Sequence, residues 1–418
     1  MSKKNTCCDN FDPNSLSFEQ AQQRILDAVK SISTQRSVSI REAFGRVLSH
    51  DVSSPLNVPP FINSAMDGYA INSVDIPSED HSVTLNMIGK SFAGQPFDGV
   101  IKAGECIRIM TGAVVPEGAD SVIMQEHSEA NDNLITIGAG HKAGQNVRHP
   151  GDDFFAGDII LKAGERLTPA KLGLLASVGV TELNVSRTPV VAFFSTGDEL
   201  KGVGQTLQAG DIYDSNRYIL FGMLKAMGVD VIDMGVIADV KEDIEKTIIA
   251  AANCADMVIT SGGASVGEAD YIKVILDEIG EVDFWKIAMK PGKPLAFGKV
   301  NETLFFGLPG NPVSAMATFY QFVQPSLKRL EGETSFDNIQ LQARCVSDLR
   351  KQAGRKDFQR GILSLDENGD LIVSTTGIQG SHMLSSMSQA NCFIVLDRES
   401  GNISAGTTVN VQPFNNLI

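Results

Sequence analysis

The chain is organised around the apolar run Asp256-Met-Val-Ile-Thr-Ser261, which passes directly into the glycine-rich turn Gly262-Gly-Ala-Ser-Val-Gly267. Such a run is typical of a buried parallel strand, and the pattern predicts that the following helix covers residues 272–279. Two similar turns, at Lys290-Pro-Gly-Lys293 and Gly307-Leu-Pro-Gly-Asn-Pro312, also follow apolar runs. Because ligands of open α/β sheets bind where strands end, we predict a ligand site here.

The glycine-rich turn carries groups that suit a phosphate. Gly262 and Gly263 lack Cβ, so backbone N–H groups can approach an anion closely. Ser261 and Ser265 add hydroxyl donors, and Asp270 stands near the start of the next helix, where a carboxylate could cap that helix or hold a metal ion. The plain alternative is an ordinary turn followed by an N-cap.

Two lysines follow on a second turn. Lys290 and Lys293 flank Pro291-Gly292, which fixes the directions of both side chains. Two ammonium groups on a rigid turn suit an oxyanion, whereas the alternative is a pair of solvated lysines. The residues alone leave both interpretations open.

Composition limits the class of protein. The chain has 418 residues, with 43% hydrophobic and 20% charged residues, which is an ordinary soluble globular composition. Its length allows about two to four domains. A net charge of −15 argues against nucleic-acid binding, which needs a basic face, but a local lysine cluster can still attract a small anion.

Cysteine usage and hydropathy indicate the cytoplasm. The cysteines are scattered without a C-x-x-C pair, so disulfide scaffolds and structural zinc are not expected; they are Cys7, Cys8, Cys106, Cys254, Cys345 and Cys392. The N-terminus has no apolar leader, and no run of 18 apolar residues occurs, so we expect neither secretion nor a membrane span. The histidines show no metal-ligand spacing, and no catalytic triad can be assembled.

The first half of the chain predicts a linking domain with an insertion. Helical spacing follows Ser17, a short helix is expected over Ile40–Phe44, and a strand over Val47–Val52. Residues 53–150 hold short apolar runs between turn residues, which indicates a β-rich domain. This domain includes Asp67, whose Asp-Gly sequence could equally be a simple turn.

The rest of the chain predicts three further parts. Residues 151–187, with a hairpin over 157–164 and a helix from Pro169, complete the linking domain begun by residues 1–52. Residues 188–333 alternate strands and helices, and residues 334–418 hold short strands. The predicted fold is therefore multi-domain α/β plus β. It has a central three-layer α/β domain with a mostly parallel sheet, an inserted β-rich domain, the linking domain and a C-terminal β-barrel-like domain.

Six ordered motifs resemble the molybdopterin molybdotransferase (MoeA) family, to which the C-terminal region of gephyrin is related. They begin at Pro60, Ile109, Ser195, Ser261, Lys290 and Gly307. The resemblance covers nearly the whole chain. It implies a four-domain elongated homodimer that inserts molybdate into adenylylated molybdopterin and releases AMP, with Mg²⁺ as the divalent cation.

The resemblance also implies roles for particular residues. In the β-rich domain and its border, it places Asp67, Thr111 and Asp153 along the active-site cleft. It makes Glu199, Asp239 and Asp270 the acidic, metal-holding residues of the α/β domain. Together with Asp67 and Asp153, these carboxylates form the implied catalytic group. The implied substrate-binding residues, including the turn residues above, are Thr111, Ser195, Gly262, Gly263, Ser265, Lys286, Lys290, Lys293, Pro294, Pro309, Pro312, Ser314 and Arg355.

Departures from the family pattern are small. Ala264 stands where valine is common, and Val240 follows Asp239 where a second aspartate is frequent. The implied chemistry joins a dianion to a pyrophosphate-bearing pterin, so lysines and a carboxylate-held Mg²⁺ supply the needed positive charge. Positioning and charge neutralisation would then carry catalysis.

Two other functions remain open from the sequence. One is a molybdopterin adenylyltransferase, which the β-rich insertion and the C-terminal domain disfavour. The other is a non-catalytic scaffold of the same fold, which the retained acidic positions disfavour. A homodimer is the expected assembly, and a molybdopterin adenylyltransferase and molybdoenzyme acceptors are further partners that the resemblance allows.

Overall fold

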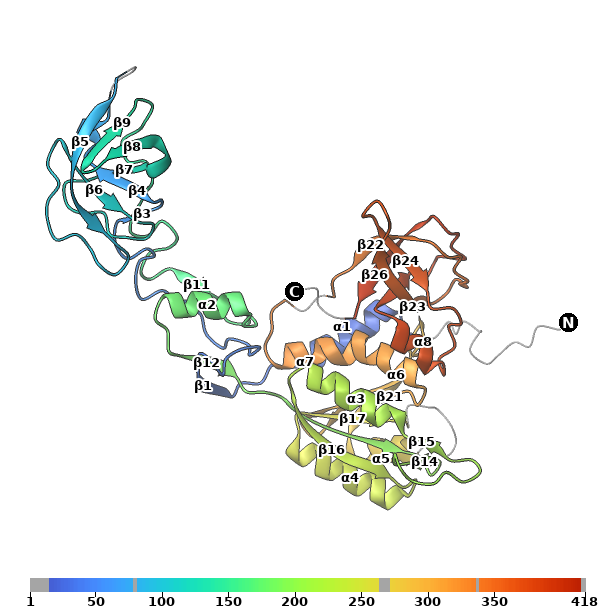
Figure 1. The fold of residues 1–418 in the computed structure, drawn as a ribbon. Coiled ribbons are helices and arrows are strands. Elements are labelled where there is room, and N and C mark those ends of the chain that lie inside the picture. The colour runs from blue at the N-terminus through green and yellow to red at the C-terminus, as the bar shows by residue number, and fades with distance from the viewer. Residues whose placement is uncertain (1–14, 78–80, 263–270, 336–337, 415–418) are drawn as a thin grey trace.

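The computed structural model describes residues 15–77, 81–262, 271–335 and 338–414 and has an elongated shape (Figure 1). A β-rich part, residues 63–148, lies at one end and is called the arm below. Two small sheets and one helix connect the arm to the body, where the α/β sheet and the C-terminal β sheet pack against each other (Figure 1). No helix in the described part is long and apolar enough to cross a membrane.

The body is built on a mixed six-stranded sheet in the order β16-β13-β17-β21-β20-β18. The first four strands are parallel to one another, and only β20 runs the opposite way, so that it pairs antiparallel with β21 and with β18. The predicted, mostly parallel α/β sheet is thus confirmed. The strands are β13 (Val190–Thr196), β16 (Asp230–Ile237), β17 (Met257–Ser261), β18 (Glu281–Lys286), β20 (Pro294–Val300) and β21 (Thr303–Leu308).

Helices cover both faces of this sheet, which gives three layers. Along β13, Val191 and Phe193 point into one core cluster, whereas Ala192 and Phe194 point into the other, as the period of two in a strand requires. The first cluster contains buried residues of α1 (Phe18–Ala28) and α3 (Ser215–Ala226), and the second contains those of α4 (Lys241–Cys254) and α5 (Tyr271–Ile279).

Two helix starts match their sequence signals. Ser17 and Gln20 form a reciprocal capping box at the start of α1, and Asp214 accepts the N–H of Arg217 at 3.1 Å at the start of α3. A cap of this kind stabilises a helix by about 1 kcal/mol. Because α1 packs on the body, the N-terminal segment is fixed beside elements that lie about 300 residues later in the sequence.

The long helix that follows Asn311 contains a π-helical turn. It consists of α6 (Pro312–Thr318), the π-helical turn η3 (Phe319–Val323) and α7 (Gln324–Leu330). Pro325 lacks the N–H that would continue the α-helical pattern, and its ring clashes with the carbonyl four residues earlier. A π-helical turn directly before the proline accommodates it without ending the helix.

The C-terminal part is a closed barrel, as predicted. Its strands follow the order β23-β24-β22-β26-β25, and β25 pairs again with β23. The α/β part contributes β19 (Met289–Lys290), which runs parallel to β23 and joins the two parts. The barrel elements are β22 (Leu341–Cys345), β23 (Lys356–Leu365), β24 (Leu371–Thr375), β25 (Cys392–Leu396), β26 (Thr408–Pro413) and the unpredicted α8 (Leu384–Gln389).

The arm holds a second six-stranded sheet, in the order β7-β4-β6-β5-β9-β8. Its central strand β4 is buried along its whole length, with apolar clusters on both sides. The elements are β3 (Asn63–Ser64), β4 (Gly68–Ile71), η1 (Ser73–Asp75), β5 (Val83–Ser91), β6 (Glu105–Ile109), β7 (Ser121–Met124), η2 (Gln125–His127), β8 (Ser128–Asn131), β9 (Leu134–Ile137) and β10 (Val147–Arg148).

The connection between arm and body differs from three sequence predictions. β11 (Ile159–Leu161) pairs with β2 (Val52–Ser53), so the local hairpin over 157–164 was wrong. The expected strand over 47–52 is reduced to isolated bridges at Val47 and Leu48 before β2 begins. The remaining elements are β1 (Gln35–Ser39), which was missed, β12 (Glu182–Ser186) and α2 (Pro169–Ser177).

The short helix predicted over Ile40–Phe44 is a turn. The N–H of Ala43 donates to the carbonyl of Ser39 at 3.1 Å, and Gly45 then takes a φ of +73° and ends the segment. A single helical hydrogen bond does not offset the cost of helix nucleation.

A buried ion-pair network holds the connection against the body. Arg166 pairs with Glu331 and Glu333 at the end of α7, and the N–H of Thr334 donates to the carbonyl of Gly164 at 3.1 Å. Burial raises the pKa of Glu331, while the charge of Arg166 opposes that increase. The network ties the segment that leaves the arm to the body.

Candidate functional site

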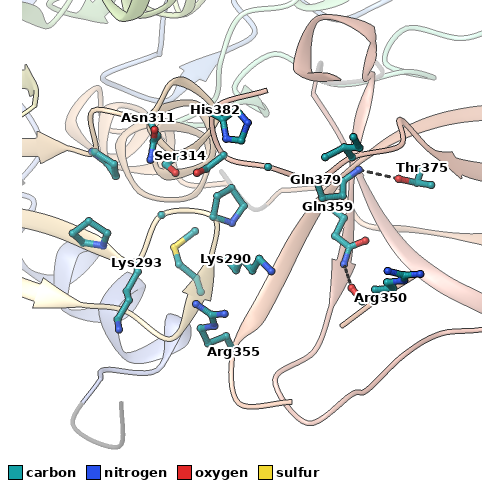
Figure 2. A pocket seen from close by; sticks show the side chains of 18 of the residues that line it. Lys290, Lys293, Asn311, Ser314, Arg350, Arg355, Gln359, Thr375, Gln379 and His382 are labelled. Atoms are coloured by element: carbon teal, nitrogen blue, oxygen red, sulfur yellow. Dashed lines mark hydrogen bonds between the residues drawn. The ribbon is translucent and has the colours of Figure 1, made fainter. Parts of the chain in front are cut away.

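A cavity of about 1220 Å³ opens between the α/β sheet and the C-terminal barrel. Its lining comes from residues 289–294 and 309–314 of the α/β part and from residues 348–359 and 375–382 of the barrel, together with Gly262. Figure 2 shows these side chains converging from both parts. The cavity therefore lies at the carboxyl ends of β17 and β21, the edge that the sequence predicted.

The side chain of Asn216 links the carboxyl ends of β17 and β21. Its side-chain amide donates to the hydroxyl of Ser261 and to the carbonyl of Gly310, both at 2.7 Å. Gly262 follows with a φ of +99°, and a Cβ there would lie 3.1 Å from the carbonyl oxygen of Thr196. Glycine is therefore required where β17 turns away from the sheet.

The turn over residues 290–293 lies where the α/β part meets the C-terminal barrel. Lys290 pairs in register with Asp357 of β23, and the side chains of Lys290 and Lys293 both line the cavity. Gly292 has a φ of +104°, and a Cβ there would lie 2.7 Å from Cγ2 of Thr318. The turn is thus packed tightly on the long helix, which fixes the directions of the two lysines.

The charge of the lining is positive. Lys290, Lys293, Arg350 and Arg355 line the cavity, and Asp348 is the single acidic residue among the described lining residues. The whole chain carries −15, so this is a local reversal of sign. Such a concave positive surface attracts small anions because the low-dielectric walls focus its field.

A buried lysine organises the loop that carries the two arginines. The ammonium of Lys351 donates to the carbonyls of Arg355 at 2.9 Å and of Ser400 at 3.0 Å. Burial lowers the pKa of Lys351, and Asp357 opposes this change. The structure places Arg350 and Arg355 of this loop at the cavity.

Asp357 is a buried carboxylate beside these cations. It is 3% exposed, and burial raises its pKa, while the charges of Lys290 and Lys351 counteract the increase. The carboxylate partly neutralises the positive charge of Lys290. Sequence reasoning missed this residue because it becomes adjacent to Lys290 only through the parallel pairing of β19 and β23.

The two described metal-holding candidates lie on neighbouring strand ends. Asp239 follows β16 and Glu199 follows β13, and the N–H of Asp239 donates to Oδ1 of Asp198 at 3.1 Å. Burial raises the pKa of Asp239, and Asp198 and Glu199 raise it further. Repulsion of this kind is typical of carboxylates that gather around a cation.

This donor set fits a hard cation that is only partly coordinated by protein. Among the described residues, no three His, Cys, Asp or Glu side chains gather closely enough to enclose a metal ion. Mg²⁺ usually takes one or two carboxylates and completes its shell with water and phosphate oxygens. Asp239 and Glu199, with the additional Asp198, offer such oxygens. Asp270, Gly263 and Ser265 lie outside the described residues.

Three buried oxygens near the same edge have no partner in the described structure. They are Oγ of Ser195, Oδ2 of Asp214 and Oδ1 of Asn216. Ser195 pairs in register with Ser261, so it neighbours the Asn216 contact described above. Buried polar atoms are normally satisfied, and a ligand or ordered water at the strand ends would satisfy these.

The remaining substrate-binding candidates divide into two groups. Pro294, Pro309, Ser314 and Arg355 line the cavity with the lysines. Lys286 ends β18 opposite Pro294, and Pro312 opens α6; neither lines the cavity. His382 and Gln379 do line it but were missed, because they lie between barrel elements without a distinctive motif.

The candidates of the arm lie far from this cavity within one chain (Figure 1). Asp67 is exposed but firmly oriented, because Oδ1 accepts both the N–H and the hydroxyl of Thr111 at 2.7 Å. These hydrogen bonds lower the pKa of Asp67. Gly68 follows it because a Cβ there would collide with the carbonyl of Ile123 on β7. Asp153 is exposed on the border segment, where its N–H donates to Val58.

Comparison with known proteins agrees with this architecture. Three family models match: the MoeA N-terminal region (domain I and II) over residues 16–179, a probable molybdopterin binding domain over 192–329, and the MoeA C-terminal region (domain IV) over 342–414. A molybdopterin molybdenumtransferase of Haemophilus influenzae is 47% identical over 96% of this chain and 100% of its own length. The chain belongs to the MoeA family.

Two further relatives extend the MoeA comparison. Gephyrin of Dictyostelium discoideum is 33% identical over 96% of this chain and 63% of its own length. The crystal structure of a molybdopterin biosynthesis moeA protein from Pyrococcus horikoshii has a TM-score of 0.84, with 27% identity over 96% of this chain and 100% of that one. The elongated arrangement of arm, connection, α/β sheet and barrel is thus that of a MoeA protein.

Proposed function

We propose that this chain acts in molybdenum cofactor biosynthesis as a molybdenumtransferase that inserts molybdate into adenylylated molybdopterin and releases AMP. The cationic cavity at the ends of β17 and β21 carries the proposal. Lys290, Lys293 and Arg355 converge there on one concave surface, and both proposed substrates are anions. Membership of the MoeA family supports the same reaction.

The cavity residues would bind and orient the two substrates. Lys290 and Lys293 neutralise oxyanion and phosphate charge, and Gly262 allows a phosphate to approach the backbone. Displacing water from the cavity when the substrates bind would strengthen these interactions. Holding two anions together in this way accounts for rate enhancement without a protein nucleophile.

Carboxylates at the ends of β13 and β16 would hold Mg²⁺ beside the phosphates. Asp239 and Glu199 supply the oxygen ligands, and Asp198 orients the Asp239 backbone at 3.1 Å. When bound, the cation would reduce the negative charge on the pyrophosphate group whose cleavage releases AMP. Asp270 belongs to the same proposed group by its family motif.

We further propose that the working unit is a cytoplasmic homodimer in which the arm of one subunit reaches the cavity of the other. Asp67 is oriented by Thr111, yet the arm that carries it lies far from the body (Figure 1). Phe61 and Met66, which precede Asp67 in the sequence, are exposed apolar side chains. A twofold axis would bring each arm to the partner's cavity and create two equivalent sites.

The test is direct measurement of AMP release. Purified protein is incubated with adenylylated molybdopterin, Mg²⁺ and molybdate, and matched reactions omit molybdate or replace the protein with the Lys290→Ala variant. Molybdate-dependent AMP release that falls in the variant supports the proposal. ATP consumption with unmodified molybdopterin would instead indicate an adenylyltransferase, and substrate binding without turnover would indicate a scaffold.

A further inference from the structure

An imidazole ring lies on the wall of the cavity and has no role in the site described so far. It belongs to His382, which stands between β24 and α8; the residue is exposed and lines the cavity. A Cβ at Gly380 would lie 2.9 Å from Cε1 and 3.2 Å from Nδ1 of this ring. Glycine at that position therefore leaves the space that the ring occupies against its own backbone.

The backbone beside His382 is fixed, whereas the ring is not engaged. The N–H of Val313, in the first turn of α6, donates to the carbonyl of Ser381 at 3.3 Å. Figure 2 shows the ring beside Asn311 and Ser314, at the start of the same helix. Within the described ranges of the chain, no hydrogen bond is made by the imidazole. Its ring nitrogens thus remain available to a ligand in the cavity.

The imidazole differs in kind from the other ionisable groups of the cavity. Those that the structure describes in the lining come from the 290–293 turn and from the segment before β23, and they are Lys290, Lys293, Asp348, Arg350 and Arg355. Lysine and arginine side chains keep their protons at neutral pH, and aspartate takes up a proton only in acid. Histidine both accepts and releases a proton near neutral pH. Among the described lining residues, His382 is therefore the group suited to passing a proton on.

The proposed reaction requires a proton transfer of this kind. Molybdopterin offers the metal a pair of thiols, and molybdate offers its oxygens. When the two join, both S–H bonds break, two S–Mo bonds form and one Mo–O bond breaks, and the released oxygen leaves with both protons as water. Molybdenum keeps its oxidation state and the total charge is unchanged, so the step needs no oxidant or reductant. Both protons must therefore travel from sulfur to oxygen.

We propose that His382 is the general acid–base residue that carries these protons. The neutral imidazole takes a proton from one thiol and gives it to the departing molybdate oxygen, which returns the ring to its neutral form for the second proton. Transfer by a positioned side chain accelerates a reaction by about a hundredfold to ten-thousandfold. The inference rests on the proposed function, because the joining of thiols to an oxyanion is what supplies the protons.

Two plainer roles for His382 predict different results. A histidine that only supports its own backbone segment would, when replaced, lower affinity and rate together. A histidine that only adds charge to the cavity would weaken substrate binding and leave the rate at saturation unchanged. A residue that carries protons should instead lower the rate at saturation and keep the affinity. The split between rate and affinity is therefore the deciding observation.

The experiment compares three full-length variants with the wild type. His382→Ala removes the ring, and His382→Asn keeps a planar, hydrogen-bonding side chain that does not exchange protons at neutral pH. His50→Asn is the matched control, because His50 is an exposed histidine of the connection between arm and body, where its Nδ1 lies 3.1 Å from the hydroxyl of Ser49. Thermal unfolding confirms that each variant is folded.

Two quantities are measured for each variant. Metal analysis of the isolated pterin gives the rate of molybdenum incorporation with both substrates saturating, and isothermal titration gives the Kd for adenylylated molybdopterin. The His382→Ala reaction is repeated with imidazole and, separately, with pyrazole. Pyrazole has the size and shape of imidazole but is far less basic, so it fills the vacated space without accepting a proton at neutral pH.

We expect both His382 variants to incorporate molybdenum about a hundredfold more slowly, with a Kd for the pterin nucleotide within about twofold of the wild type. Imidazole should restore about a tenth of the wild-type rate to His382→Ala, and pyrazole should restore none. His50→Asn should match the wild type. If His382→Ala does not fold, the split between rate and affinity in His382→Asn decides alone.

Three results would overturn the inference: a wild-type rate in either folded His382 variant, a loss of rate matched by an equal loss of affinity, or a loss in His382→Ala that imidazole relieves no better than pyrazole. Any of these, in a chain whose wild type incorporates molybdenum and releases AMP, leaves the proposed function intact. A wild type that incorporates no molybdenum would refute the proposed function, and this inference with it.

Discussion

The cavity and the arm hold their functional groups in contrasting ways. In the cavity, cations from segments far apart in the sequence are fixed by strand pairing, tight glycine turns and buried carbonyl networks. In the arm, one carboxylate is fixed by a single neighbouring threonine and faces solvent. The difference teaches that the described lining of the cavity is assembled within one chain, whereas the groups of the arm lie outside it and act, in our proposal, on the site of a partner subunit.

The largest expected effect is in the cavity. Lys290→Ala should lower molybdate-dependent AMP release about a hundredfold or more, because removing a preorganised donor to a developing anion costs on that order. AMP release under saturating pterin nucleotide measures the change. Lys246→Ala, at an exposed lysine of α4, is the control and should keep full activity. Equal activities of the two variants would mean that Lys290 is only a solvated lysine.

We expect a substitution in the arm to reduce activity less than the loss of Lys290 does. Thr111→Val removes the hydroxyl donor to Asp67 but keeps the backbone donor, so we expect about a tenfold loss of activity with an unchanged fold. The loss of one hydrogen bond should also raise the pKa of Asp67, which nuclear magnetic resonance titration of its carboxyl carbon can follow. A wild-type rate combined with a raised pKa would show that the orientation of Asp67 is irrelevant to catalysis.

The joint between arm and body can be tested through stability. Arg166→Met leaves Glu331 buried without its partner, which should lower the free energy of unfolding of the body by about 3 kcal/mol. Lys171→Met, which breaks the more exposed pair with Glu165, should cost only about 0.5 kcal/mol. Urea denaturation measures both. Similar values for the two variants would mean that the network does not anchor the connection.

The smallest expected effect is the change in the pH dependence of stability when Asp239 is replaced. The pKa of Asp239 is raised from its ordinary value of 3.8 because it is partly buried beside Asp198 and Glu199. Charging Asp239 therefore opposes folding above its native pKa, and this penalty disappears below pH 3.8, where the group is protonated in both states. Without Mg²⁺, Asp239→Asn should raise Tm slightly at pH 7 and leave it unchanged at pH 3.5.

The same variant should weaken the response to Mg²⁺. Thermal shift measured with and without the cation at pH 7 checks this expectation. The assignment of Asp239 to the metal-holding group would be contradicted if Asp239→Asn were less stable than the wild type without Mg²⁺ and were stabilised by Mg²⁺ as much as the wild type.

Strand and turn chemistry made much of the fold predictable. The continuous apolar run over 256–261 indicated a buried parallel strand, and the spacing after Ser17 indicated a helix; the structure confirms both. Short segments were less predictable. Residues 40–44 lacked enough length to nucleate a helix, and β11 pairs with a strand about a hundred residues earlier rather than locally. The domain boundaries themselves remain predictions.

Site residues within recognisable motifs could be predicted from the sequence, whereas residues that strand pairing brings to the site could not. Lys290, Lys293 and Ser314 lie in recognisable turns, and the structure places all three on the cavity. Asp357 carries no motif, and it comes to lie beside Lys290 only because β23 pairs with β19. Long-range pairing of this kind leaves no periodic signal in a single sequence.

The central claim, that an arm completes the cavity of a partner subunit, has a direct test. Asp67→Asn and Lys290→Ala should each inactivate a homodimer. In a mixed dimer, however, one site carries both changes and the other carries none. With random mixing, half of the dimers are mixed, so about a quarter of all sites should regain AMP release. Activity no higher than that of the separate variants, with mixed dimers verified by mass, would contradict a site shared between two chains.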